Sequence, residues 1–136
     1  MSDALPDLEQ QLKQAGAALG ATTQLIDTAL SALKAQTTEG DRVSLAKLDE
    51  HQLASYELSL SWSECTAARF LAAHALKLAA DSVSANALTI KLSNLFCAEA
   101  ITNTINRLRA RPADYGMTHA DTVMNPAAEE FLEQQV

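Results

Sequence analysis

The clearest signal in the chain is Leu8-Glu-Gln-Gln-Leu-Lys-Gln-Ala-Gly-Ala-Ala-Leu-Gly-Ala-Thr-Thr-Gln-Leu-Ile-Asp-Thr-Ala-Leu-Ser-Ala-Leu33. Its apolar residues recur alternately three and four positions apart, which places them in one stripe along a helix. The stripe consists of Leu5, Leu8, Leu12, Ala15, Leu19, Thr22, Ile26, Ala29 and Leu33. We therefore predict a helix from about Pro6 to Leu33, with Pro6 in the opening turn, where no N–H is needed.

Two more helical patterns follow a break at Thr37–Asp41. The region from about Ser44 to Ala80 is one very long helix or two helices end to end. Its predicted apolar side is formed by Leu45, Leu48, Leu53, Tyr56, Leu60, Ala67, Phe70 or Leu71, His74 and Leu78. A third helix is expected from about Ala85 to Arg109, with Ser84 as its N-cap and Pro112 as its stop. Its apolar residues are Leu88, Leu92, Leu95, Phe96, Ile101, Ile105 and Leu108.

The C-terminal part is predicted to be an irregular loop over about residues 112–125, followed by a short helix. Asn125 would cap that helix and Pro126 would take its first position, so that Phe131 and Leu132 dock on the other helices. Long amphipathic helices with short connections bury their faces by lying antiparallel. We therefore predict an all-α fold: an antiparallel up-down bundle of three long helices plus a short C-terminal helix, in one domain over 1–136.

Small residues and the spacing of the apolar residues indicate how these helices could pack. Ala15, Gly16 and Gly20 would let a partner helix approach the first helix closely. The spacing of three and four also fits a coiled coil, so part of the apolar surface could face another chain. The aromatic residues Trp62, Phe70 and Phe96 are expected in the core, which is the commoner place for such side chains at helical spacing.

Composition excludes several classes of partner. Hydrophobic residues make up 48% of the chain, aromatic residues only 4%, and the formal charge is -7. This acidity argues against nucleic acid or an anionic membrane as the main partner. The longest charge-free stretch, Gln14–Ile26, is shorter than the roughly 20 apolar residues that cross a bilayer. Cys65 and Cys97 lie in predicted helices, and we expect a reducing, cytoplasmic location with no membrane span.

Catalytic and metal-binding motifs are not recognisable in the chain. No Glu-x-x-His pair, paired-cysteine spacing, Gly-x-Ser-x-Gly elbow or phosphate-binding loop occurs. His51 and His74 are expected to be interfacial or core residues. The arginines of Arg107–Arg111 are expected to form a solvated helix end, with phosphate or CoA binding as the alternative. The chain therefore holds no self-contained active site, and we predict neither a metal site nor a catalytic residue.

Five short segments nevertheless follow a familiar order: Ala17-Ala-Leu-Gly20, Arg42-Val-Ser-Leu-Ala-Lys-Leu48, Glu50-His51-Gln52, Ala67-Ala68-Arg69 and Ala98-Glu99-Ala100. In this order they resemble the C-terminal helical domain of the acyl-CoA dehydrogenase family. That domain has a helix rich in alanine, glycine and leucine, a turn that begins at an arginine, and a Glu-His-Gln helix start. The resemblance would cover most of the chain from Leu12 to Gly116.

The resemblance implies a role in a flavoenzyme assembly. Arg42 and Gln52 fall where the family contacts FAD across a subunit interface, and acyl-CoA would be the substrate of the whole enzyme. The chain would then contribute to a FAD and acyl-CoA site shared with another domain or subunit. Arg107-Leu-Arg-Ala-Arg-Pro112 replaces the family's glycine-rich stretch. The alternative is therefore a non-catalytic interaction or oligomerisation module that has lost flavin binding, in which Arg42 is a solvated turn residue.

Overall fold

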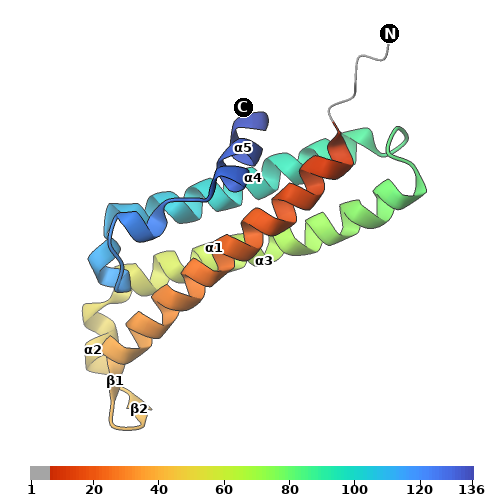
Figure 1. Ribbon diagram of the computed structural model, residues 1–136. Coiled ribbons are helices and arrows are strands. Elements are labelled where there is room, and N and C mark those ends of the chain that lie inside the picture. Colours follow the sequence, from red (N-terminus) through yellow and green to blue (C-terminus); the bar gives the residue numbers. More distant parts are fainter. Residues whose placement is uncertain (1–6) are drawn as a thin grey trace.

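The computed structural model describes residues 7–136 and shows a helical bundle (Figure 1). The long helices are α1 (Leu8–Thr37), α3 (Gln52–Asp81) and α4 (Ala87–Ala110). The shorter elements are β1 (Thr38–Glu39), β2 (Arg42–Val43), α2 (Leu45–Glu50), the 3-10 helices η1 (Pro112–Tyr115) and η2 (Ala120–Thr122), and α5 (Pro126–Gln134). The long helices alternate in direction and pack against one another in all three pairs, which confirms the predicted all-α up-down bundle.

Helix α1 follows the sequence pattern closely. Every described residue of the predicted stripe is buried, and Leu12, Ala15 and Ala29 have no exposed surface. Asp7 caps the helix by accepting the N–H of Gln10 at 3.0 Å. The helix ends at Thr37 rather than at Leu33, because the buried Thr37 extends the stripe by one more turn. The predicted contributions of Leu5 and Pro6 lie outside the described residues.

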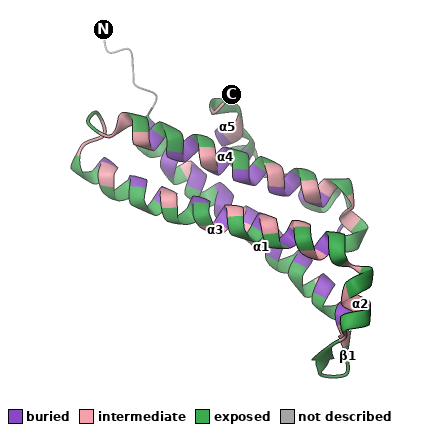
Figure 2. Cartoon of the chain, turned by 180° about the vertical axis from the view of Figure 1, so that it is seen from behind, coloured by how far each residue is buried: buried purple, intermediate pink, exposed green. Residues whose placement is uncertain are grey.

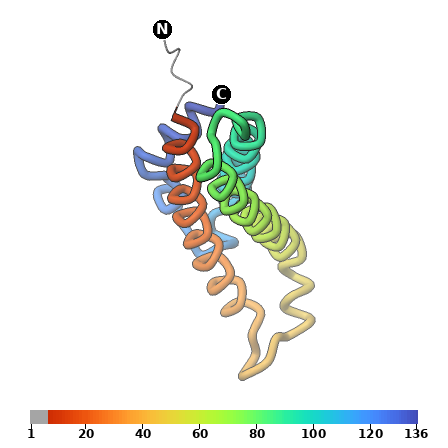
Figure 3. The backbone as a smooth tube through the Cα atoms, turned by 90° about the vertical axis from the view of Figure 1, so that its right-hand side faces the viewer, coloured from red at the N-terminus to blue at the C-terminus, as the bar shows by residue number. Residues whose placement is uncertain are grey.

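The predicted break after α1 is a short hairpin that turns the chain back (Figure 3). Thr38 pairs with Val43 and Glu39 with Arg42, which leaves a two-residue turn. Gly40 occupies the first turn position with φ +65°, a conformation that glycine adopts without strain. Ser44 then caps α2 by accepting the N–H of Lys47 at 3.3 Å, so the second helical region is two helices end to end.

The predicted apolar side of α3 was wrong. The buried residues of α3 are Ala54, Leu58, Ser61, Cys65, Ala68, Ala72, Ala75 and Ala79. Tyr56 and Phe70, which were expected inside, are 66% and 75% exposed, and Trp62 is also exposed. His74 is exposed as well. The reason is that the buried side chains of α3 are small, so the helix backbones can lie close together. Figure 2 shows where buried and exposed positions fall along the helix.

The contacts between α3 and α4 show this close approach directly. The Cys97 thiol donates to the carbonyl oxygen of Ala68 at 3.6 Å, and the Cys65 Sγ lies 3.4 Å from Thr104 Oγ1. In α4 the predicted face is correct in the second half, where Ile101, Ile105 and Leu108 are buried. In the first half it is wrong, because Leu88, Leu92 and Leu95 are exposed and the buried residues include Ile90, Ser93 and Asn94.

The start of α4 also differs from the prediction. The helix begins at Ala87, and Ser84 is not its N-cap; that position belongs to Asn86, which makes no capping side-chain hydrogen bond. Instead, the Ser82 hydroxyl accepts the N–H of Ala85, and the Asn86 amide donates to the carbonyl of Leu78 at 3.0 Å. Because the Asn86 side chain bonds to Leu78, it holds the α3–α4 connection against the end of α3 and does not cap α4. The helix therefore begins at Ala87, two residues later than predicted.

The C-terminal segment closes one side of the bundle. Asn125 caps α5 by accepting the N–H of Ala128 at 2.9 Å, as predicted, and Phe131 is fully buried where α5 packs on α1. The loop over 112–125 is not wholly irregular, because η1 and η2 lie within it. Gly116, at φ +66°, lies against α1, where a Cβ atom would come within 2.8 Å of the Ala32 Cβ.

The prediction of close approach at the first helix was wrong for Gly16 and Gly20. A Cβ atom added at Gly16 or Gly20 would have no atom within 4 Å, so neither glycine is needed for packing. Ala15, by contrast, is fully buried. The small residues that matter most for helix contacts are therefore the alanines of α3.

Candidate functional site

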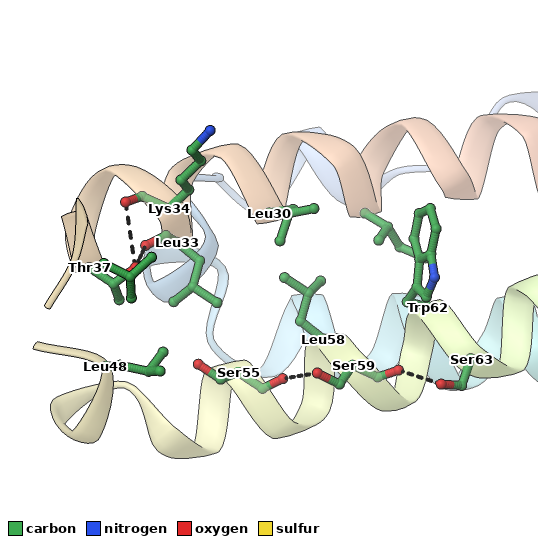
Figure 4. Close-up of a pocket in the computed structure, with 12 residues that line it drawn as sticks. Leu30, Leu33, Lys34, Thr37, Leu48, Ser55, Leu58, Ser59, Trp62 and Ser63 are labelled. Carbon is green, nitrogen blue, oxygen red and sulfur yellow. Dashed lines mark hydrogen bonds between the residues drawn. The ribbon is translucent and has the colours of Figure 1, made fainter. Parts of the chain in front are cut away.

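An apolar groove lies between α1 and α3, next to the hairpin (Figure 4). It encloses about 740 Å³. Its apolar lining consists of Ile26, Leu30, Leu33, Val43, Leu48, Leu58 and Trp62, and its polar lining of Lys34, Thr37, Ser55, Ser59 and Ser63. Both helices and the hairpin contribute, so the groove exists only because the chain folds back at the hairpin.

The walls of the groove leave large apolar side chains open to solvent. Leu30 is 49% exposed, Trp62 is 47% exposed and Val43 is 56% exposed. In Figure 4, Trp62 extends from α3 towards α1, and Leu30 points from α1 towards Leu58. Sequence reasoning assigned Trp62 to the core and did not single out Leu30. The available signal was that Leu30 lies outside the regular stripe of α1 and is therefore an extra apolar residue on that helix.

The polar groups of the groove are mostly satisfied within their own helices. The Ser59 hydroxyl donates to the carbonyl of Ser55 at 2.8 Å, and the Ser63 hydroxyl donates to that of Ser59 at 2.9 Å. Thr37 likewise donates to Leu33 at 2.9 Å. Among the described residues, Lys34 is the one charged residue of the lining, and Figure 4 shows its ammonium pointing away from α3. The Ser55 hydroxyl is the exception, since it is buried and has no hydrogen-bond partner among the described residues. The groove therefore offers mainly apolar surface, with no acid–base pair.

Arg42, one of the predicted FAD contacts, lies in the connection between α1 and α3, and Gln52, the other, lies at the start of α3. Arg42 is exposed on β2, directly before the groove residue Val43, and makes no ion pair in the described part of the chain. Gln52 is exposed at the first position of α3, and its amide donates to Asp49 Oδ1 at 3.2 Å. No hydrogen bond joins the two side chains. Both are therefore accessible to another molecule rather than part of an enclosed site.

A second, smaller cavity of about 310 Å³ lies where η1 meets the start of α3. His51 is within 2.8 Å of Gln36 Oε1, and the Gln36 amide donates to the carbonyl of Asp114 at 3.4 Å. These contacts connect the ends of three elements. The partner of His51 is a neutral amide, so the contacts do not form a catalytic pair.

The arginines near the end of α4 are occupied within the protein, which corrects the expectation of a solvated helix end. Arg107 donates to both carboxylate oxygens of Glu64, at 2.9 and 3.1 Å. Arg109 donates to the carbonyl of Thr122 at 3.0 Å, and Arg111 donates to Glu57 at 2.6 Å. These groups hold α3 and the C-terminal segment against α4. They are therefore not free to form a phosphate site.

Tyr115 and the two cysteines have raised pKa values with structural causes. Burial, together with the hydrogen bond to Glu57, raises the pKa of Tyr115, whose hydroxyl donates to that carboxylate at 3.0 Å. Burial raises the pKa of the Cys97 thiol to about 11 and also raises that of Cys65. Nucleophilic cysteines need a lowered pKa and access, so both cysteines are core residues.

Neither a metal centre nor a membrane span emerges from residues 7–136. No group of three histidine, cysteine, aspartate or glutamate side chains in this range is arranged to hold a metal ion. None of the helices in the same range is long and apolar enough to cross a membrane. The apolar groove is therefore the strongest candidate for a functional site.

Comparison with protein-family models, with curated proteins and with solved structures finds no match for this chain. Its function must therefore be inferred from the groove and the surrounding surface.

Proposed function

We propose that this chain is a helical interaction module whose groove between α1 and α3 binds a partner polypeptide. The observation that carries the proposal is the open apolar groove of about 740 Å³, with Leu30 and Trp62 half exposed on its two walls. Tryptophan is enriched among the residues that contribute most to binding between proteins. A groove with apolar walls, in which the hydroxyls of Thr37, Ser59 and Ser63 are bonded within their own helices, suits apolar side chains rather than a polar substrate.

The dimensions of the groove favour a helix as the bound segment. The α1 wall runs from Ile26 to Thr37, which is about 18 Å at 1.5 Å per residue. This length matches roughly three turns of a helix that packs along the groove with one apolar face towards it. Burying apolar surface contributes about 25 cal/mol per Å², so covering Leu30 and Trp62 would be the main gain.

Groove substitutions test this function. In a pull-down from the source cells, the wild-type chain is expected to retain a polypeptide that Leu30→Glu and Val43→Glu lose, because a carboxylate in the groove would be desolvated by the partner. Leu88→Glu is the matched control, since Leu88 is 71% exposed at the start of α4, away from the groove. Equal retention by all four proteins, with unchanged circular dichroism, would contradict the proposal.

A second candidate is a flavoenzyme domain of the acyl-CoA dehydrogenase type. It is supported by the position of Arg42, an exposed guanidinium without an intramolecular ion pair in the described residues, beside the groove. A guanidinium of this kind suits the diphosphate of FAD held by another subunit. The chain would then contribute to a shared FAD and acyl-CoA site, with Gln52 nearby along the chain as the second contact.

Flavin content distinguishes the second candidate from the first. If the complex purified from the source absorbs at the wavelengths of oxidised flavin, Arg42→Ala is expected to lower its flavin content several-fold, because the diphosphate loses a charged partner. Lys77→Ala, an exposed change on α3 away from the hairpin, is the control. A colourless complex, or flavin content that Arg42→Ala leaves unchanged, would leave Arg42 a surface residue and favour the interaction module alone.

A further inference from the structure

We propose that the partner in the groove is a second copy of this chain, related by a two-fold axis that passes between Leu30 and Ser31 of α1. The proposal rests on the proposed function, because it names the occupant of the same groove. In a two-fold dimer the same surface is used by both copies, so the surface must be complementary to itself. The α1 rim of the groove meets this requirement in its charges as well as in its apolar residues.

The charges on α1 are placed symmetrically about the proposed axis. Asp27 lies three residues before Leu30, and Lys34 lies three residues after Ser31. Asp27 and Lys34 are seven residues apart, so they project from nearly the same side of the helix. An antiparallel crossing of the two α1 helices at this axis therefore brings Asp27 of each copy opposite Lys34 of the other. A parallel crossing would bring like charges together.

Both charges are free to form these pairs. Asp27 and Lys34 are exposed, and neither makes an ion pair within the described part of the chain. Figure 4 shows the Lys34 ammonium pointing away from α3, on the rim rather than in the apolar floor. The charged residues Asp27 and Lys34 can therefore fix the relative orientation of the two chains, while the apolar lining of the groove is buried in the contact.

The apolar residues fit the same arrangement. With the two grooves face to face, α1 and α3 of each copy form a four-helix arrangement, and Leu30 and Trp62 of both copies lie in its centre. A stable dimer buries about 800 Å² on each partner, which is about a tenth of the 8046 Å² surface of this chain. An interface of that size includes the rim as well as the groove, so Asp27 and Lys34 would lie within it.

Charge reversal in solution tests the proposal. In sedimentation equilibrium, the wild-type protein is expected to dimerise, and Asp27→Lys and Lys34→Asp are each expected to raise the dimer Kd about tenfold or more, because each places like charges at both symmetric contacts. The double variant Asp27→Lys/Lys34→Asp restores opposite charges and is expected to return the Kd to near the wild-type value. Lys77→Glu, on another part of α3, is the control and is expected to leave the Kd unchanged.

Trp62 provides an independent reading, because it is the one tryptophan of the chain and lines the groove. Its emission is expected to shift to shorter wavelength as the wild-type protein and the double variant are concentrated, and to stay unshifted over that range in the single variants. A monomer at all concentrations, or a dimer insensitive to the charge reversals, would overturn this inference. The interaction function would survive either result if Leu30→Glu still abolished the capture of a different polypeptide.

Discussion

Phe131→Ala is expected to lower the free energy of unfolding by about 3–5 kcal/mol, which is the usual cost of removing a buried phenylalanine ring. Phe131 has no exposed surface, and it lies on the face of α5 that packs against α1. The Asn125 cap and Ala128 fix the helix but bury little surface themselves, so α5 depends on this ring for docking. Urea unfolding followed by circular dichroism at 222 nm measures the change.

Phe70→Ala is the matched control for that experiment. Phe70 is 75% exposed on α3, and the loss of its ring is expected to change the free energy of unfolding by less than about 0.5 kcal/mol. The same substitution at the two sites thus compares the stability contribution of a buried phenylalanine ring with that of an exposed one. A cost at Phe70 equal to that at Phe131 would contradict the orientation of α3.

Ala68→Leu is expected to lower the free energy of unfolding by about 1–3 kcal/mol through overpacking. Ala68 has no exposed surface, and its carbonyl oxygen accepts from the Cys97 thiol of α4 at 3.6 Å. A leucine side chain there would push α3 and α4 apart along a contact made of small residues. Thermal and urea unfolding are the measurements.

Ala67→Leu, one residue earlier, is the control that tests which face of α3 is buried. Ala67 is exposed, and leucine and alanine are both good helix formers, so the change is expected to be within about 0.5 kcal/mol of the wild type. The sequence pattern placed Ala67 on the buried side. The reverse result, with Ala67→Leu costly and Ala68→Leu neutral, would place Ala67 rather than Ala68 on the buried side of α3.

The difference between α1 and α3 explains how much of the fold was predictable. In α1 the buried positions include large residues such as Leu12, Leu19 and Ile26, so the buried stripe is also the more apolar one. In α3 the buried side is mainly alanine, while Tyr56 and Phe70 are outside. A search for the most apolar stripe therefore succeeds on α1 and fails on α3. Close contact between backbones rewards small side chains, and that contact cannot be recognised from one helix alone.

The candidate site was predictable only in part. Arg42 was expected in a turn and Gln52 at the helix start after it; Arg42 lies in the hairpin, Gln52 is the first residue of α3, and both are exposed. Their role in flavin binding stays a prediction. The groove itself was missed, because its walls come from residues about 30 positions apart along the chain, such as Leu30 and Trp62. Their proximity depends on the packing of α1 against α3.

Because periodicity and capping act over a few residues, local signals in the chain were sufficient for the three long helical regions, the break after α1 and the cap at Asn125, although not for the start of α4. Tertiary packing alone decided which face of α3 is buried, where Arg107 and Arg111 find their carboxylates, and where the groove opens. These features depend on surfaces that are distant in the sequence and meet only after folding. Burial is a property of two surfaces in contact, so a single helical pattern cannot specify it.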